Sequence, residues 1–360
     1  MSKIKDQTAY WRCDAARPAP GLPKDIVGQT ATKLITAMIW ISLVSIALAA
    51  VLAAGAVVLR AYRADLQGAR AAVRVGAKLA ATKAGLIEYA ETGSGMPLLS
   101  IHGAGGGLDQ GLANAAELLG DGFRIIAPSR FGYLSTPVPA NSSPAAQADA
   151  HAALLTHLNV DKAIVVGISA GARSAIELTL RHPDRVAAVV LIVPGTYAPA
   201  SPVAIEPSRA SRFAFWLVNA GADLAWWVIE KTSPAVLTRF IGVPSEVVAA
   251  ASKADQDRAT RIVRSIQPLS LRFQGINIDS DPPLIRPPLE QIRTPTLIIS
   301  ARDDLFNTLP AAEFAAAAIP NARLVVYETG GHLLVGHTRE VRSRVADFLT
   351  SAGVTPTASD

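Results

Sequence analysis

Apolar and polar residues follow two different patterns along the chain. Residues 34–59 carry no charge and consist mainly of Ile, Leu, Val and Ala, which favours one helix without a polar face. From residue 85 onward, short apolar runs rich in β-branched residues alternate with helix-like segments, a pattern typical of buried parallel strands joined by helices. The predicted strands cover residues 98–101, 163–166, 189–193, 295–300 and 323–327. We therefore expect an α/β domain preceded by an apolar helix.

The apolar run 34–59 is long enough to cross a membrane. At about 1.5 Å per helical residue it spans about 39 Å, against a hydrocarbon core of about 30 Å. A cleavable signal peptide has a shorter apolar region near the chain start, whereas this run follows a polar tail over residues 1–33. We predict a permanent transmembrane helix in contact with lipid, although Ala-Leu-Ala at residues 47–49 resembles a cleavage site. Near the ends of the run, two basic residues precede it and four follow it: Lys24 and Lys33, and Arg60, Arg63, Arg70 and Arg74. This difference favours a cytoplasmic location for the rest of the chain.

Residues 60–84 are predicted to form a basic stalk helix. Arg63, Arg70, Arg74 and Lys78 recur at spacings of seven, four and four, which places them along one helix face. Such a face is typical of a solvated helix surface, and it is also suited to contact with anionic lipid headgroups.

A serine stands between a predicted strand and a predicted helix. The sequence Gly-Ile-Ser-Ala-Gly at residues 167–171 follows the apolar run 163–166 and precedes a helix expected over 170–180. Glycines two residues before and after the serine allow a turn too sharp for Cβ atoms, and this turn raises the serine oxygen above the end of the sheet. Ser169 is therefore the candidate nucleophile.

A glycine-rich loop lies upstream of this serine. The predicted strand 98–101 runs into His-Gly-Ala-Gly-Gly-Gly at residues 102–107. Backbone N–H groups in such a loop can point at a developing oxyanion. A phosphate-binding loop would end in Gly-Lys-Ser or Gly-Lys-Thr, but this loop continues with Leu-Asp-Gln. The oxyanion interpretation is therefore favoured.

Acidic residues and a histidine follow two later strands. Asp303 and Asp304 come after strand 295–300, and His332 comes after strand 323–327 and a Gly-Gly pair. Parallel strands end at one edge of the sheet, where α/β proteins collect their active sites. Serine, acid and histidine in this order are expected of one hydrolase fold. Only His332 and His337 follow the acids, and we favour His332 as the general base.

The remaining histidines are expected in other environments. His102 belongs to the glycine-rich loop and is expected to be structural, and His182 closes the helix after the serine. His151 and His157 lie on a helix predicted over 145–158 and are expected to be solvated. No pair of histidines has metal-ligand spacing beside suitable carboxylates, so we expect neither a metal nor a cofactor.

Together these motifs resemble the α/β-hydrolase superfamily over about residues 85–353, and in particular its serine branch with a helical cap. The resemblance includes Ile-Ile-Ala-Pro-Ser-Arg-Phe-Gly-Tyr at 125–133, Arg-His-Pro-Asp-Arg-Val at 181–186 and Gly-Gly-His at 330–332. It implies a mostly parallel central sheet flanked by helices, with Ser169 as nucleophile and His332 as base. It also implies Ala104 and Ala170 as backbone N–H donors to the oxyanion.

The same resemblance implies that one of Asp303 and Asp304 is the acid. Relatives that end this strand in Arg-Asp-Asp use the second aspartate, which favours Asp304. The resemblance places a cap insertion at residues 196–290, between core segments 85–195 and 291–353. Aromatic residues of this insertion are expected to form the cap core and partly to line an apolar substrate pocket: Phe213, Phe215, Trp216, Trp226, Trp227 and Phe240.

Departures from related families narrow the expected chemistry. Haloalkane dehalogenases and epoxide hydrolases resemble this fold but have aspartate at the position of Ser169. Carbon–carbon bond hydrolases have asparagine before the serine, usually glycine two residues after it, and tryptophan after the histidine. This chain has Ile168, Gly171 and Leu333, so two of these three marks are missing. A serine nucleophile implies an acyl-enzyme, hence an ester, thioester or amide substrate, and we favour a small apolar ester. Carbon–carbon hydrolysis, a cofactor-free haloperoxidase-like activity and a catalytically silent binding or scaffold module are the alternatives.

The composition of the chain argues against nucleic-acid binding and against an internal disulfide. The net charge of +5 comes largely from the tail and the stalk, and no basic motif is interleaved with aromatics, so nucleic-acid binding is not expected. The single cysteine, Cys13, rules out a disulfide within the chain.

Overall fold

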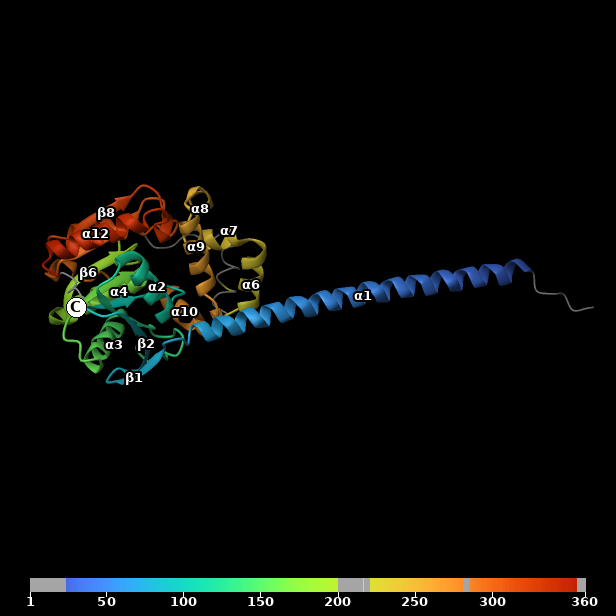
Figure 1. The fold of residues 1–360 in the computed structure, drawn as a ribbon, viewed down its shortest axis with the longest axis horizontal. Coiled ribbons are helices and arrows are strands. Elements are labelled where there is room, and N and C mark those ends of the chain that lie inside the picture. The colour runs from blue at the N-terminus through green and yellow to red at the C-terminus, as the bar shows by residue number, and fades with distance from the viewer. Residues whose placement is uncertain (1–23, 200–215, 217–220, 281–284, 355–360) are drawn as a thin grey trace, which may run out of the picture. The chain divides into compact units, whose positions relative to one another are not determined.

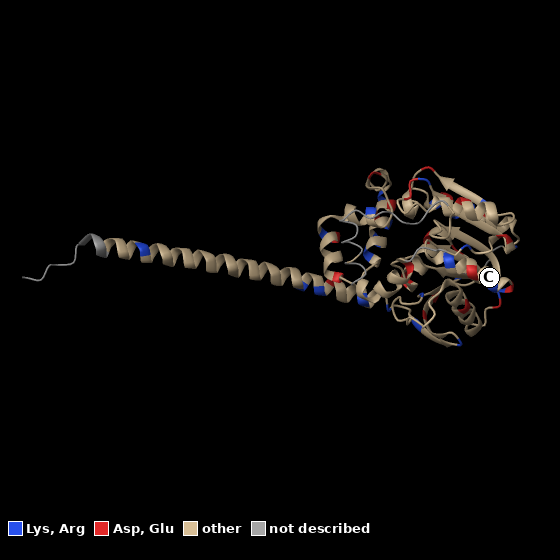
Figure 2. Ribbon diagram, turned by 180° about the vertical axis from the view of Figure 1, so that it is seen from behind, with Lys and Arg blue, Asp and Glu red and all other residues tan. Residues whose placement is uncertain are grey.

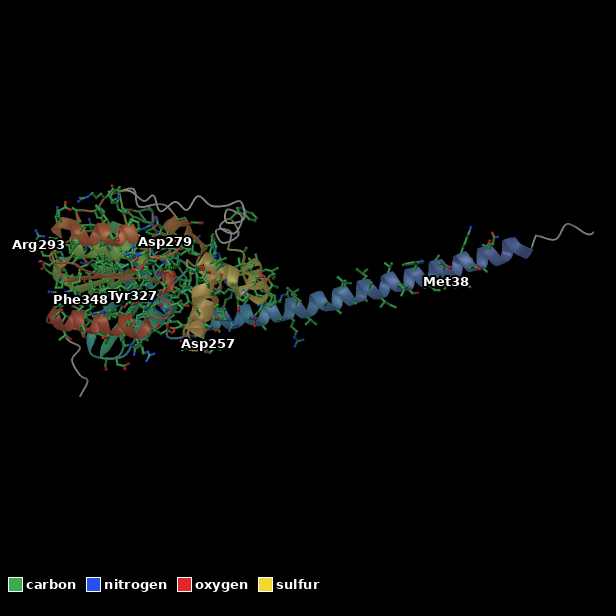
Figure 3. All side chains as sticks on the ribbon, turned by 90° about the horizontal axis from the view of Figure 1, so that it is seen from above. Met38, Asp257, Asp279, Arg293, Tyr327 and Phe348 are labelled. Atoms are coloured by element: carbon green, nitrogen blue, oxygen red, sulfur yellow. The ribbon has the colours of Figure 1, made fainter. Side chains whose placement is uncertain are left out.

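The computed structural model describes residues 24–199, 216, 221–280 and 285–354. The chain divides into two compact units, Met1–Ala61 and Tyr62–Asp360. In the first unit the described residues are helical: the predicted apolar run lies within α1 (Lys24–Ala72), and large side chains such as Met38 are exposed (Figure 3).

Helix α1 is a candidate membrane span by length and composition. Among the described residues it is the one helix long and apolar enough to cross a membrane, and the mean hydropathy of its apolar window is 2.6. The sequence has no charged residue between Lys33 and Arg60, and Figure 2 shows a long stretch of α1 with neither blue nor red ribbon.

The described part of the second unit contains one eight-stranded sheet with the order β1-β2-β4-β3-β5-β6-β7-β8. Figure 1 labels β1, β2, β6 and β8 of this sheet. The bounds are β1 Lys78–Thr82, β2 Gly85–Thr92, β3 Met96–Ile101, β4 Phe123–Pro128, β5 Ala163–Ile168, β6 Val186–Ile192, β7 Thr296–Ala301 and β8 Arg323–Tyr327. The pairs β1–β2 and β2–β4 are antiparallel, and every later pair in the order is parallel. The five strands predicted from apolar runs correspond to β3, β5, β6, β7 and β8, so the predicted parallel sheet is confirmed.

Helices cover both faces of this sheet. On one face α3 (Pro144–His157), α4 (Gly171–Arg181) and α11 (Leu309–Ala318) contribute to one apolar cluster. On the other face α2 (Leu108–Leu119) and α12 (Thr338–Ser351) contribute to a second cluster. The central strands β5, β6 and β7 are covered on both faces and bury nearly all of their side chains, which explains their continuous apolar runs. Because β3, β5, β7 and β8 are parallel, the loops that follow them leave the sheet at one edge.

Between β6 and β7 the described residues form a helical cap. Its helices are α6 (Asp223–Thr232), α7 (Pro234–Phe240), α8 (Ser245–Ala250), α9 (Lys253–Ser265) and α10 (Phe273–Ser280). Trp226, Leu237 and Ile241 of the cap share one apolar cluster with Tyr133, which belongs to the loop after β4. The cap is therefore packed onto the sheet domain through a common core.

The stalk-helix prediction for residues 60–84 is wrong beyond Ala72. Helix α1 ends there, and β1 pairs antiparallel with β2. Gly76 has a φ of 72°, a left-handed conformation that ends the helical path. Lys78 pairs with Glu91 at 2.8 Å across the two strands, and Ala80 is buried. The helical spacing of the basic residues thus continued by chance into a strand, and the sheet domain starts at β1.

The last turns of α1 belong to the second unit and contact α6. Asp65 accepts a hydrogen bond from Trp227 Nε1 at 2.9 Å and lies 3.0 Å from Lys231 Nζ. The rings of Tyr62 and Trp227 meet edge to face with centroids 5.8 Å apart. Specific contacts therefore fix this segment to the cap.

Candidate active site

Ser169 lies on a strained turn between β5 and α4. Its backbone has a φ of 51°, a left-handed conformation that is unfavourable for a residue with a Cβ atom. The Ser169 N–H group donates to Ile192 O at 2.9 Å, and the Gly195 N–H group donates to Ser169 O at 3.0 Å. The strand–turn–helix geometry expected from the sequence is present.

Crowding explains the two glycines of this turn. A Cβ atom on Gly167 would lie 2.6 Å from Ala175 Cβ, and one on Gly171 would lie 2.5 Å from His102 O. Both distances are shorter than van der Waals contact, so larger residues would require movement of a close-packed core. The contact of Gly171 also packs the start of α4 directly against the glycine-rich loop.

The glycine-rich loop 102–107 lies beside Ser169. It joins β3 to α2, and a Cβ atom on Gly103 would lie 3.0 Å from Ser169 Cβ. Within the described residues, the backbone N–H groups of Ala104 and Ala170 have no hydrogen-bond acceptor. Unpaired N–H groups on both sides of a serine are suited to stabilise an oxyanion formed there.

Asp304 and His332 are hydrogen-bonded to each other. Asp304 follows β7, His332 lies in the 3₁₀ turn after β8, and His332 Nδ1 lies 2.8 Å from Asp304 Oδ2. Both side chains are buried. Asp304 also accepts hydrogen bonds from Phe306 N–H at 2.8 Å and from the Thr308 hydroxyl at 2.5 Å. An imidazole that donates Nδ1–H to this carboxylate presents Nε2 as its basic nitrogen.

Asp303 has different partners from Asp304. Its carboxylate accepts hydrogen bonds from Gly330 N–H at 3.1 Å and Gly331 N–H at 2.8 Å. It therefore holds the backbone just before His332, whereas Asp304 contacts the imidazole ring. The two adjacent aspartates act on the same loop in two ways.

The cap residue Gly242, which the sequence did not single out, also contacts this loop. Its carbonyl oxygen accepts hydrogen bonds from Leu305 N–H at 3.1 Å and from His332 N–H at 3.0 Å. Its φ is 85°, and a Cβ atom there would lie 2.6 Å from His332 Cβ. A single glycine after an apolar helix is too common a pattern to reveal this role.

His151 is buried and not solvated as predicted. Its side chain is 0% exposed, and its Nε2 lies 3.3 Å from Ser174 Oγ on α4. Burial, with a smaller effect from the charge of Arg130, lowers the pKa of His151 to about 3. Helix α3 contains few charged residues, so its sequence did not reveal which face packs against α4. His157 is exposed, as predicted.

The other histidines have structural partners. In the glycine-rich loop, His102 Nδ1 lies 2.7 Å from Gly103 O, its Nε2 accepts from Arg130 N–H at 3.0 Å, and burial lowers its pKa well below the usual value. His337 stacks on Tyr327 with ring centroids 4.1 Å apart. Among the described residues, no group of three His, Cys, Asp or Glu is placed to hold a metal ion.

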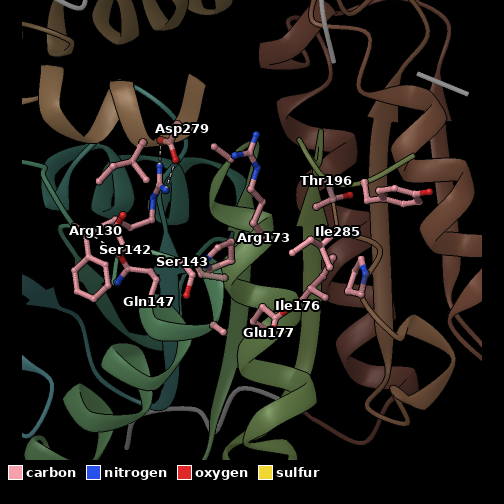
Figure 4. Close-up of a pocket in the computed structure, with 18 residues that line it drawn as sticks. Arg130, Ser142, Ser143, Gln147, Arg173, Ile176, Glu177, Thr196, Asp279 and Ile285 are labelled. Atoms are coloured by element: carbon pink, nitrogen blue, oxygen red, sulfur yellow. Dashed lines mark hydrogen bonds and ion pairs between the residues drawn. The ribbon is translucent and has the colours of Figure 1, made fainter. Parts of the chain in front are cut away.

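A cavity of about 460 Å³ lies beside the elbow (Figure 4). It runs along α4 through Ala170, Arg173 and Glu177, and Ile285 lines it from the end of the cap. Burial raises the pKa of Glu177. Ser169, Asp304 and His332 are not among its described lining residues. The cavity is therefore a neighbouring space that shares Ala170 with the candidate site.

The described cap tryptophans fall into two environments. Trp226 and Trp227 are buried, and Trp226 meets Phe240 edge to face with centroids 5.7 Å apart. Trp216 is exposed. None of the three lines the cavity beside the elbow. The predicted pocket residues Phe213 and Phe215 lie outside the described part of the chain.

In a comparison with known protein families, residues 96–336 match the model of the family described as alpha/beta hydrolase fold. This range includes Ser169, Asp304 and His332. A solved structure with a similar fold is an alpha/beta hydrolase fold protein from Nakamurella multipartita, with 31% identity and a TM-score of 0.60. The match covers 77% of this chain and 99% of that one.

Curated proteins with similar sequences are named for different substrates. The 2-hydroxy-6-oxo-6-phenylhexa-2,4-dienoate hydrolase of Comamonas testosteroni is 25% identical over 273 residues, covering 73% of this chain and 91% of that protein. The pimeloyl-(acyl-carrier protein) methyl ester esterase of Aromatoleum aromaticum is 30% identical over 250 residues, covering 65% of this chain and 90% of that protein.

Proposed function

The chain belongs to the α/β-hydrolase family, and we propose that it is a membrane-anchored serine hydrolase that cleaves a carboxylic ester with an apolar acyl group. The observation that carries the proposal is the buried hydrogen bond between His332 and Asp304, in loops at the sheet edge where β5 delivers Ser169 on a strained turn. This combination is what nucleophilic catalysis by a serine needs.

In the proposed reaction, His332 removes the hydroxyl proton of Ser169 while the serine oxygen attacks the carbonyl carbon of the ester. The carbonyl electron pair moves onto oxygen, where the N–H groups of Ala104 and Ala170 stabilise the negative charge. Protonated His332 then gives its proton to the departing alkoxide, which leaves as the alcohol. Asp304 holds the imidazole in the required tautomer and stabilises its charged form.

The acyl-enzyme is then hydrolysed by the same groups. His332 takes a proton from a water molecule, and the water oxygen attacks the acyl carbon. Collapse of the second oxyanion breaks the bond to Ser169, which recovers its proton from His332 as the carboxylic acid leaves. Acylation therefore transfers the proton of the Ser169–His332 pair to the departing alcohol, and deacylation restores it from water.

Carbon–carbon bond hydrolysis is the second candidate. It is favoured by relatives that are named as a dienoate hydrolase and as a 2-hydroxymuconate semialdehyde hydrolase. Against it, Ile168 and Leu333 stand where such enzymes have asparagine and tryptophan. The methyl ester esterase named above favours ester chemistry.

The test is a substrate comparison with the purified full-length protein in detergent. We expect turnover of p-nitrophenyl esters, with kcat/KM rising several-fold per added methylene until the pocket is full, because each buried methylene contributes about 0.8 kcal/mol. We expect no turnover of 2-hydroxy-6-oxo-6-phenylhexa-2,4-dienoate. Turnover of the dienoate alone would favour the second candidate. A protein that turns over neither and takes no fluorophosphonate would be a silent binding module.

The proposed anchor is α1, with the catalytic domain on the cytoplasmic side. Support comes from its uncharged stretch and from the basic residues that follow it. We expect the full-length protein to remain in the membrane pellet after carbonate extraction. Recovery of a soluble chain that begins near residue 50 would show cleavage instead.

A further inference from the structure

Two ion pairs, one fully buried and one with a buried guanidinium and a partly exposed carboxylate, join the end of the cap to the loops beside the elbow. Arg272, just before α10, pairs with Asp109 at the start of α2. Asp279 in α10 (Figure 3) pairs with Arg130 in the loop after β4. The side chain of Arg272 is 0% exposed and that of its partner Asp109 is 22% exposed. The side chains of Arg130 and Asp279 are 7% and 5% exposed. Buried charges are costly to desolvate, so two such pairs from one short segment require an explanation.

Arg272 also binds the backbone of the glycine-rich loop. Its Nη1 donates to Gly106 O at 2.5 Å and to Asp109 Oδ1 at 3.1 Å, while its Nη2 donates to Asp109 Oδ2 at 2.8 Å. A Cβ atom on Gly107 would lie 2.7 Å from Arg272 Nη1, so the glycine makes room for the guanidinium. One cap residue therefore fixes the end of the loop that leads into α2.

Asp279 acts on the other part of the loop through Tyr133 and Arg130. Its Oδ2 accepts a hydrogen bond from the Tyr133 hydroxyl at 2.5 Å, and that hydroxyl accepts one from Gly105 N–H at 3.3 Å. Both Nη atoms of Arg130 donate to Asp279 (Figure 4), and its Nε donates to His102 O at 2.9 Å. A single carboxylate therefore holds the two side chains that bind Gly105 and His102.

Backbone hydrogen bonds and close packing hold this cap segment tightly against the core. Leu134 N–H donates to Leu271 O at 2.7 Å, and Gly275 N–H donates to Gly132 O at 3.0 Å. A Cβ atom on Gly275 would lie 2.2 Å from the Tyr133 ring. Helix α10 is thus pressed against Tyr133, whose hydroxyl reaches the glycine-rich loop.

We propose that Arg272 and Asp279 are positioning residues that hold the Ala104 N–H group in its oxyanion-binding orientation. This inference rests on the proposed function. Ala104 lies between Gly103, which packs against Ser169, and Gly105, which binds Tyr133. A donor must lie about 2.7–3.1 Å from the developing charge, and a misplacement of about 1 Å can lower the rate about 100-fold. The cap is then part of the catalytic framework as well as a cover.

The test compares Arg272→Gln with Arg272→Lys in the full-length protein. Active sites are counted by fluorophosphonate labelling, and kcat, KM and the inhibition constant of a trifluoromethyl ketone are measured per labelled site. The ketone forms a tetrahedral adduct whose oxyanion needs the same N–H groups. We expect Arg272→Gln to lower kcat by about 10- to 100-fold and to change KM by no more than about twofold. The inhibition constant of the ketone should rise by a factor similar to the loss of kcat. Arg272→Lys keeps the charge and should recover part of the loss.

Tyr133→Phe is the second variant, because it removes one hydroxyl and leaves both ion pairs in place. We expect its kcat to fall about 5- to 10-fold, with weaker ketone inhibition and little change in Tm. The matched control is Arg261→Gln, which removes an exposed pair between cap and core, Arg261 with Glu117, and should leave kcat unchanged.

The outcomes separate the two proposals. Wild-type kcat and ketone affinity in folded Tyr133→Phe and Arg272→Gln would overturn the inference and leave the proposed function standing. If Arg272→Gln does not fold, Tyr133→Phe alone decides. A lower Tm with unchanged kcat per labelled site would assign these residues a purely structural role. A wild-type protein that hydrolyses no ester and takes no fluorophosphonate would instead overturn the proposed function, and the inference with it.

Discussion

Ser169 itself is held by backbone contacts, whereas the ring of His332 and the backbone before it are held by the carboxylate side chains of two aspartates. Ser169 has a left-handed φ, and the backbone of the glycine-rich loop packs against it. His332 is held by the carboxylate of Asp304 at its ring and by that of Asp303 at the preceding backbone. We therefore expect larger side chains around Ser169 to disturb the site by steric clash. Around His332 we expect changes in the chemistry of the carboxylates to disturb it.

The cap contacts both sides of the site, but with different groups. Gly242 offers a backbone carbonyl to the loops of Asp304 and His332, and Arg272 offers a guanidinium to the glycine-rich loop. A substitution in the cap can thus disturb either side from a distance. The substitutions below test the contributions of the two sides separately, beginning with the one that has the largest expected effect.

Ser169→Ala should lower kcat/KM for esters by about 10⁵-fold or more, because it removes the nucleophile. Ser169→Gly should be equally inactive and should raise the free energy of unfolding by about 1 kcal/mol, because glycine adopts a φ of 51° without strain. The measurements are ester kinetics and chemical denaturation. Substantial turnover by either variant would remove Ser169 from the mechanism.

Asp304→Asn should lower kcat by about 10⁴-fold, because an amide favours the wrong imidazole tautomer. Asp303→Asn should lose far less, because one amide oxygen can still accept a backbone N–H bond from the loop before His332. Steady-state kinetics of both variants test this difference. Equal losses of kcat in the two variants would contradict the assignment of Asp304 to the imidazole ring and of Asp303 to the backbone before it.

Gly242→Ala should lower kcat about 100-fold, because a Cβ atom would lie 2.6 Å from His332 Cβ and displace the imidazole. Gly336→Ala is the matched control: its φ is 88°, close to the 85° of Gly242, but a Cβ atom there meets nothing within 4 Å. Both variants should lose stability through backbone strain, measured as Tm. A comparable loss of kcat in the control would contradict the proposed contact.

His151→Gln should have the smallest effect and should act on stability alone. Burial lowers the pKa of His151 to about 3, against about 6.5 for an exposed histidine, so the unfolded chain binds a proton that the folded chain does not. The free energy of unfolding should therefore fall as pH falls from about 6.5 toward 3. The variant should reduce this slope by about 1.4 kcal/mol per pH unit. Chemical denaturation of the wild-type protein and the variant between about pH 3 and 6.5 measures the slope.

Sequence patterns predicted the parts of the fold that depend on local chemistry. The buried parallel strands carry continuous apolar runs, and the elbow requires glycines at fixed positions around Ser169, so both could be located without coordinates. The order of the strands places the loops of Ser169, Asp304 and His332 at one edge, as the family pattern implied.

Contacts between distant segments could not be predicted in the same way. The basic residues keep a helical spacing past Gly76, but this segment forms β1. Its strand conformation depends on antiparallel pairing with β2, whose residues lie further along the chain. The burial of His151 depends on the packing of α3 against α4. Arg272 and Gly106 are 166 positions apart in sequence, and neither residue type indicates the other.

The most direct test of the central claim is intact-mass analysis of the full-length protein treated with a fluorophosphonate, followed by peptide mapping. We expect one adduct per chain, located on Ser169, with the label absent in Ser169→Ala and strongly slowed in Asp304→Asn. Labelling at another serine, or an unlabelled wild-type protein alongside a labelled control hydrolase, would contradict the account.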